Sequence, residues 1–168
     1  MPPPGPRSSA RLRGHYTLGQ VEGGTARFEE AAGIFYDLLA ARPRESDPSG
    51  WAATQVDLGT VLSSWGKRDS GTARLEQAVA AYDAALEVET RDRSPLHWAT
   101  IQNNLAIALA SLGERENGTS HLEEAVAVYG AAFGEYRRDR VPLDWAMTQM
   151  NLGNALSALG GGRTEPHV

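Results

Sequence analysis

WAATQVDLG (51–59), WATIQNNLA (98–106) and WAMTQMNLG (145–153) are three versions of one segment, spaced 47 residues apart in a chain of 168 residues. An ungapped comparison of residues 51–97 with residues 98–144 gives 23 identities in 47 columns. A repeat with a period between about 20 and 50 residues is typical of stacked supersecondary units, each of which needs a neighbour to bury its apolar face. The repeat therefore predicts one continuous array of such units.

Each copy opens with a segment that has the apolar spacing of an α-helix. In the first copy, large apolar residues fall on one stripe of a helix with about 3.6 residues per turn. These residues are Trp51, Leu58, Leu62 and Trp65. The spacing predicts three such helices, termed A helices below, and each is expected to end in a left-handed glycine cap. The capping glycines would be Gly66, Gly113 and Gly160.

A second helix, termed the B helix, is expected after each of the first two A helices. It is predicted to run from about Ala73 to Arg91 in one copy, and from about Ser120 to Arg138 in the next. Basic residues at its end would interact favourably with the negative end of the helix dipole. Proline, which suits the first turn of a helix, then precedes each new A helix at Pro95 and Pro142.

The repeat continues upstream with fewer matching columns. They predict a first B helix over residues 25–41, whereas its A partner over residues 4–19 fits the pattern only at Leu18 and Gly19. The expected organisation is a disordered, Pro- and Arg-rich N-terminus (1–14), a repeat domain (15–160) and a flexible C-terminal tail (161–168), with repeat boundaries near 50/51, 97/98 and 144/145.

The order of small and large residues resembles the tetratricopeptide repeat. The matching columns are Leu58-Gly59-x-x-Leu62, Ala78-x-x-x-Tyr82, Ala85 and Pro95, and in the next copy Leu105-Ala106-x-x-Leu109, Ala125-x-x-x-Tyr129, Ala132 and Pro142. That family usually has a period of about 34 residues. The chain is therefore similar to a long-period bacterial subtype, with both turns lengthened, and distantly similar to kinesin light chain repeats. The resemblance implies an all-α solenoid of antiparallel helix pairs, coiled as a right-handed superhelix.

In this family the A helices line a concave groove that binds peptides, so the resemblance implies a set of groove residues. They are Asp57 in the first A helix, Thr100, Asn103, Asn104 and Ile107 in the second, and Met147, Met150, Asn151 and Asn154 in the third. An asparagine amide both donates and accepts, so it can pair with the backbone of an extended peptide. The alternative is that these side chains bond to neighbouring helices or face water. Because no cation precedes the closing glycines, a clamp for a C-terminal carboxylate is not expected.

Composition narrows the class of function. The chain has no cysteine, and its net charge of −5 argues against a nucleic-acid-binding protein, which normally presents a basic face. Although the chain is acidic as a whole, arginines cluster at the expected ends of the B helices, and a stripe of them is a minor candidate for binding phosphate groups. These are Arg91, Arg93, Arg137, Arg138 and Arg140. The alternative is that they cap helix ends in solvent.

Motifs for catalysis are missing from the sequence. The four histidines are not at metal-ligand spacing, and no phosphate loop or nucleophile elbow occurs, so we expect no catalytic site, metal or cofactor. No secretory leader or membrane-spanning run is found, and the expected location is the cytoplasm. Fifteen of the sixteen cations are arginine, which is typical of a high-GC bacterial genome.

The sequence therefore favours a non-catalytic protein-interaction module that binds a peptide or helix in its groove. Two alternatives remain. The third A helix has no B helix after it, so residues 145–160 could form a homodimer contact or the working surface of a self-assembling scaffold. The chain could also be a fragment of a larger multi-repeat signalling protein.

Overall fold

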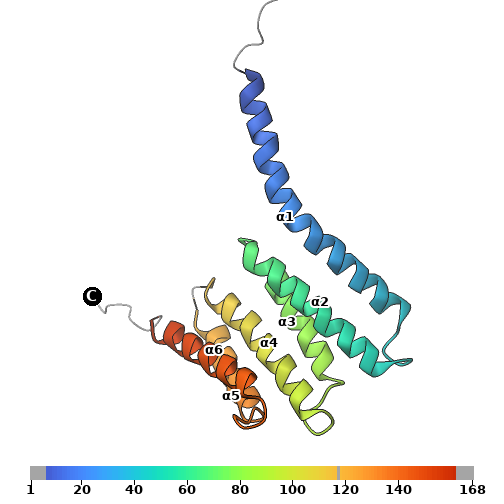
Figure 1. The fold of residues 1–168 in the computed structure, drawn as a ribbon, viewed down its shortest axis with the longest axis vertical. Coiled ribbons are helices and arrows are strands. Elements are labelled where there is room, and N and C mark those ends of the chain that lie inside the picture. Colours follow the sequence, from blue (N-terminus) through green and yellow to red (C-terminus); the bar gives the residue numbers. More distant parts are fainter. Residues whose placement is uncertain (1–6, 117, 162–168) are drawn as a thin grey trace, which may run out of the picture.

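Six α-helices and no strand make up the part of the chain described by the computed structural model, which covers the backbone of residues 7–116 and 118–161 and the side chains from residue 24 onward. The helices are α1 (Arg7–Ala41), α2 (Pro48–Arg68), α3 (Ala73–Leu86), α4 (Pro95–Gly113), α5 (Ser120–Phe133) and α6 (Pro142–Gly161). Helices α2, α4 and α6 are the three A helices, and α3, α5 and the second half of α1 are B helices. The predicted all-α solenoid of antiparallel helix pairs is confirmed (Figure 1).

The helices form two layers, because each one packs mainly against the next helix along the chain. The A helices also contact one another, α2 with α4 and α4 with α6, whereas no Cα atoms of the described B helices lie within 8 Å of another B helix. The A helices are therefore the inner, more tightly spaced layer of the stack. The handedness of the superhelix stays a prediction.

The A helices begin where the prolines predict. Pro48, Pro95 and Pro142 are each the first residue of their helix, and the carboxylate of Asp47 caps α2 by accepting a hydrogen bond of 3.0 Å from the backbone N–H of Gly50. Proline fits there because the first turn of a helix leaves its N–H groups without partners in any case.

The B helices end earlier than predicted. Helix α3 ends at Leu86 rather than Arg91, and α5 ends at Phe133 rather than Arg138. Each helix ends early because the residues that follow it are buried in a non-helical loop. Val88 and Tyr136, in these loops, are each only 6 % exposed. The arginines thus lie in the loops between B and A helices and not in the last helical turn.

The prediction of left-handed glycine caps is wrong. No described residue has a positive φ; Gly66 lies inside α2, which continues to Arg68, and Gly113 is the last residue of α4. A Cβ atom on Gly66 would lie 2.8 Å from Cγ of Leu75, and one on Gly113 would lie 2.6 Å from Cγ of Leu122. Glycine is therefore needed here because the A and B helices approach too closely to admit a side chain.

Helix α1 differs from the expected organisation of the N-terminus. Its backbone is one continuous helix from Arg7 to Ala41, so residues 7–14 are helical and no separate A helix precedes the first B helix. The sequence of residues 4–19 lacks the apolar stripe of an A helix, which explains why residues 7–19 continue α1 and do not form a separate helix that packs against it. Residues 1–6 and most of the expected tail, residues 162–168, lie outside the described residues.

The close approach of the helices predicts that one substitution has different effects in two copies of the repeat. Gly113→Ala should lower the free energy of unfolding by about 1–3 kcal/mol, because the new methyl group overpacks against Leu122. Gly160→Ala, in the equivalent column of α6, meets no atom within 4 Å and should change it by less than about 0.5 kcal/mol. Urea unfolding of both variants at low protein concentration measures the difference. Equal effects would show that the close approach of Leu122 is not what requires glycine at residue 113.

Candidate functional site: the inner face of the A helices

A small polar cavity of about 110 Å³ lies between the first two A helices. Its lining residues are Thr60, Ser63, Ser64, Lys67, Tyr82, Asn104 and Ile107. The hydroxyl of Tyr82, from the B helix behind, lies 3.3 Å from Oγ1 of Thr60. The structure thus brings together two of the predicted groove residues, Asn104 and Ile107, in one recess.

Asn104 differs from its neighbour Asn103 in how its amide is used. The Oδ1 atom of Asn103 accepts a hydrogen bond of 3.1 Å from Oγ1 of Thr148, which is only 1 % exposed. Asn104 is half-buried, and its amide makes no hydrogen bond to any residue in the described part of the chain. Asn103 therefore joins α4 to α6, whereas Asn104 keeps its hydrogen-bonding groups available for a ligand.

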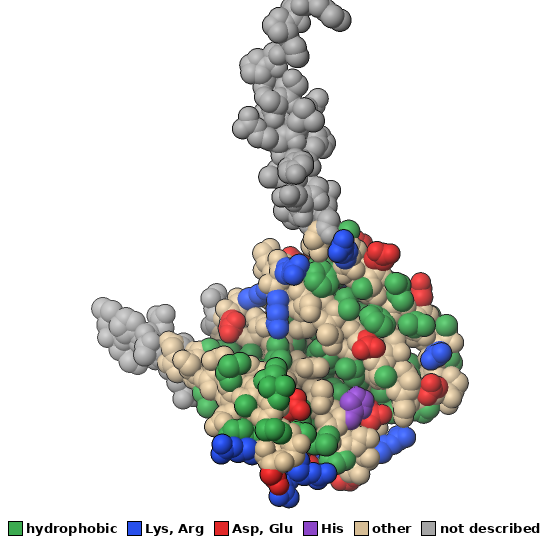
Figure 2. Space-filling view, viewed as in Figure 1, with side chains coloured by type: hydrophobic (Ala, Val, Ile, Leu, Met, Phe, Trp, Pro, Cys, Tyr) green, Lys and Arg blue, Asp and Glu red, His purple; other side chains and the backbone are tan. Residues whose placement is uncertain are grey.

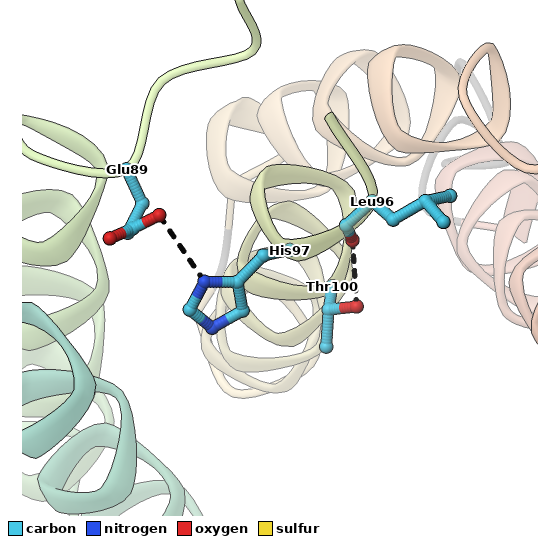
Figure 3. A network of polar contacts seen from close by, with 4 residues as sticks. All are labelled: Glu89, Leu96, His97 and Thr100. Atoms are coloured by element: carbon cyan, nitrogen blue, oxygen red, sulfur yellow. Dashed lines mark hydrogen bonds and ion pairs between the residues drawn. The ribbon is translucent and has the colours of Figure 1, made fainter. Parts of the chain in front are cut away.

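Thr100 is also used within the protein. Its hydroxyl donates to the carbonyl oxygen of Leu96 at 2.9 Å and accepts from the hydroxyl of Tyr136 at 3.2 Å. Figure 3 shows the first of these bonds beside a second polar contact, in which Nδ1 of His97 lies 3.4 Å from a carboxylate oxygen of Glu89. Glu89 is 6 % exposed, so His97 serves to satisfy a buried carboxylate.

The remaining predicted groove residues are mostly open to solvent. Met147 and Met150 are 47 % and 60 % exposed, Asp57 and Asn154 are exposed, and Asn151 is half-buried. Asn151 and Asp57 occupy the column of Asn104 in the other two A helices, and like Asn104 they form no hydrogen bond to a described side chain or backbone group. Three unused polar groups therefore repeat along the A helices.

Lys67 also lines the cavity, although the sequence did not indicate it. The A helix was expected to end at Gly66, but α2 continues to Arg68, so Lys67 is helical and lines the cavity. The reason for the miss is the false glycine cap. A usable signal was present, because the same column of the next copy holds Glu114, so the charge at this surface position differs between copies.

Arginines in the loops before the A helices, termed the arginine edge, stack on tryptophan at positions that repeat with the 47-residue period. The guanidinium carbon of Arg91 lies 5.7 Å from the ring centroid of Trp98, and Arg44 and Arg138 lie 5.3 Å and 5.4 Å from Trp51 and Trp145. Such stacking contributes about 0.5–1 kcal/mol at exposed sites.

Part of the edge is also neutralised by carboxylates. Arg91 pairs with Glu135, Arg44 pairs with Glu87 at 2.5 Å, and Arg137 pairs with Asp139 at 3.2 Å. Arg93 lines a wider recess of about 540 Å³ together with Arg44 and Glu87. Basic and acidic side chains accordingly alternate along the lower edge in Figure 2, and the stripe is not a continuous basic surface.

Two buried tyrosines behind the inner face predict that the folded protein loses stability at alkaline pH. Burial raises the pKa of the Tyr82 hydroxyl, with a smaller opposing effect of the hydrogen bond to Thr60, and burial also raises the pKa of Tyr129. The folded state therefore keeps protons that the unfolded state releases near the ordinary pKa of 10.0. The two tyrosines therefore contribute their full share of the free energy of unfolding below pH 10.0, and this share is lost as the pH rises further.

The raised pKa values predict how stability depends on pH. Tyr82→Phe and Tyr129→Phe should each make the free energy of unfolding fall less steeply above pH 10.0. An unchanged slope would show that these hydroxyls do not cause the fall.

The bond between α4 and α6 predicts an energetic coupling. Thr148→Val should lower the free energy of unfolding by about 1 kcal/mol, because it leaves the amide oxygen of Asn103 without its donor. Asn103→Ala should cost less in the Thr148→Val background than alone, as a double-mutant cycle would measure. Asn104→Ala is the matched control and should change stability by less than about 0.5 kcal/mol. Additive effects of the first two substitutions would show that the bond contributes nothing.

Within the described residues, no helix is long and apolar enough to cross a membrane, and no group of three or more His, Cys, Asp or Glu residues could hold a metal ion. Comparison with curated proteins and with solved structures finds no match for the chain. Residues 98–139, which cover most of α4, all of α5 and most of the loop that follows α5, match the family model of the tetratricopeptide repeat.

Proposed function

We propose that the protein is a non-catalytic protein-interaction module whose inner face, formed by α2, α4 and α6, binds an extended segment or a helix of a partner protein. The observation that carries the proposal is the column Asp57, Asn104 and Asn151, whose polar groups are all unused by the described part of the chain. A long-period bacterial tetratricopeptide repeat with a right-handed superhelix is part of the same proposal.

The column supports this function because of what the neighbouring residues do. Asn103 and Thr100 lie on the same helix as Asn104, but the amide oxygen of Asn103 and the hydroxyl of Thr100 are already bonded to other residues of the protein. A half-buried amide without a partner has already lost part of its hydration, so a ligand that donates and accepts in the plane of that amide recovers bonds at a low cost of desolvation. An extended peptide backbone offers such a pattern of donors and acceptors.

The surroundings of the column define the chemistry of the partner. Ile107 lines the cavity beside Asn104, and the exposed Met147 and Met150 add flexible apolar contacts on α6. Lys67, on α2, supplies one positive charge to the cavity lining. We infer a ligand that combines apolar side chains with an acidic group placed near Lys67.

A second candidate function is a structural scaffold that assembles through α6. The exposed hydrophobic side chains of this helix favour it, and they gather over α6 in Figure 2. A role as one part of a larger multi-repeat signalling protein would use the same inner face.

Binding to an array of immobilised random peptides tests the groove. The double variant Asn104→Ala/Asn151→Ala should bind the selected peptides at least about tenfold more weakly, because each lost hydrogen bond contributes about 1 kcal/mol. Lys67→Glu should weaken mainly those peptides that contain acidic residues.

The matched control is Asn103→Ala, which removes an amide from the adjacent position and should lower stability without changing peptide selection. If Asn103→Ala weakens binding as much as the double variant does, or if the double variant binds as the parent does, the inner face is not the binding site. Circular dichroism of every variant separates loss of binding from loss of fold.

A further inference from the structure

The two end helices of the described stack are each half of a helix pair. Helices α2 and α4 are A helices that pack closely against the B helices α3 and α5. Helix α6 is an A helix whose described contacts are with α5 and α4 only, and α1 is a B helix whose described contacts are with α2 only. The stack therefore presents an unpaired A helix at one end and an unpaired B helix at the other, as Figure 1 shows.

On α6, the columns that bind a B helix in the other repeats are open. Leu156 is 49 % exposed, whereas its equivalents Leu62 and Leu109 are each 1 % exposed. A Cβ atom on Gly153 or Gly160 would meet no atom within 4 Å. These glycines occupy the columns of Gly59 and Gly66, where a Cβ atom would overlap with a B-helix side chain, so α6 keeps two vacant seats of the same kind.

On α1, apolar side chains are exposed in columns that the other B helices bury. Ile34 is 55 % exposed and Leu38 is 39 % exposed. Their equivalents in α3 are Ala81 and Ala85, which are 5 % and 0 % exposed. The uncovered side of α1 is thus more apolar than the same side of a B helix inside the stack, and a surface of this kind indicates an interface.

The charge pattern points in the same direction. Helix α6 has one charged residue, Asp144, in its first turn, and none over residues 145–161. Such a stretch is unusual for a helix that faces water, because surface helices normally carry charges on their open side. Residues 145–161 of α6 therefore carry no charge that could repel a second helix.

We propose that α6 of one molecule packs against α1 of a second copy and so completes the missing helix pair between two molecules. The register follows from the pairs within the chain, in which Tyr82 fills the seat at Gly59 and Leu75 fills the seat at Gly66. The residues 47 positions before Tyr82 and Leu75 are Phe35 and Phe28. Phe35 of the second copy therefore occupies the seat at Gly153, and Phe28 occupies the seat at Gly160.

This contact joins different surfaces of two identical molecules. Because α1 and α6 lie at opposite ends of the stack, one contact leaves a free α1 face and a free α6 face, and the assembly grows head to tail. The inner face of the A helices is not used, so the assembly does not depend on the peptide groove.

Light scattering measures the assembly. The average mass should exceed the 18.0 kDa of one chain at concentrations on the order of 100 μM and should fall toward it on dilution. Leu156→Glu should return the protein to 18.0 kDa, because it places a charge between the two seats. Leu143→Glu, in the first turn of α6, is the control and should assemble as the parent does, because its column stays exposed inside the stack as well, where the equivalent Leu96 is 42 % exposed. A mass of 18.0 kDa at every concentration would overturn the proposal.

Disulfide cross-linking tests the register, since the chain has no cysteine of its own. A mixture of a Gly153→Cys chain with a Phe35→Cys chain should form a covalent dimer, because a disulfide requires Cα atoms within about 7 Å. The mismatched mixture of Gly160→Cys with Phe35→Cys is displaced by seven residues, about 10 Å along a helix, and should not form one. Rapid cross-linking of Gly153→Cys with itself would show a symmetric α6–α6 contact and would overturn the head-to-tail arrangement.

Discussion

The close approach of each A helix to the B helix that follows is the constraint on which the stack depends. At Gly66 the backbone N of Leu75 would lie only 3.0 Å from an added Cβ atom, and at Gly113 the backbone N of Leu122 would lie 2.9 Å away. These short distances let leucine and tyrosine side chains of the B helix reach between the turns of the A helix, where they become fully buried. Most of the stabilising apolar contact is thus made within a repeat, and the repeats then stack through the outer sides of the same helices.

The period of the sequence predicted the helices well, because burial imposes the same residue type on the same column in every copy. It predicted the ends of the helices less well. Gly66 and Gly113 have the position and the identity of capping residues, and only the neighbouring leucines show that each glycine instead makes room for a side chain of the B helix. The basic residues after Leu86 and Phe133 likewise resemble the last turn of a helix. The helices end before them, at Leu86 and Phe133, and Val88 and Tyr136 in the following loops are buried.

The candidate site shows the same limit at the level of single side chains. Asn103 and Asn104 are adjacent and chemically identical. The repeat separates them only by column, because the column of Asn104 holds Asp57 and Asn151 whereas that of Asn103 holds Val56 and Met150. It does not show which neighbour each amide meets. One full residue of rotation about the helix axis directs Asn103 to the buried hydroxyl of Thr148, whereas Asn104 lines the cavity with Ile107. Such a distinction depends on which neighbour each side chain meets, and that is set by the packing of two repeats rather than by either one.

The arginines show how far one repeat depends on the next. Arg44 and Arg91 each stack on the tryptophan of the following A helix, and each pairs with a carboxylate near the end of the following B helix, Glu87 or Glu135. Arg138 stacks on Trp145 in the same way, but it has no carboxylate partner among the described residues. Exposed ion pairs contribute only about 0–1 kcal/mol, so these contacts fix the register of neighbouring repeats more than they stabilise them. The last described repeat thus has its tryptophan in place and lacks the acidic group that a further B helix provides inside the stack. The open columns at Gly153 and Gly160 and the lack of a carboxylate beside Arg138 have the same cause, which is that no described B helix packs against the far side of α6.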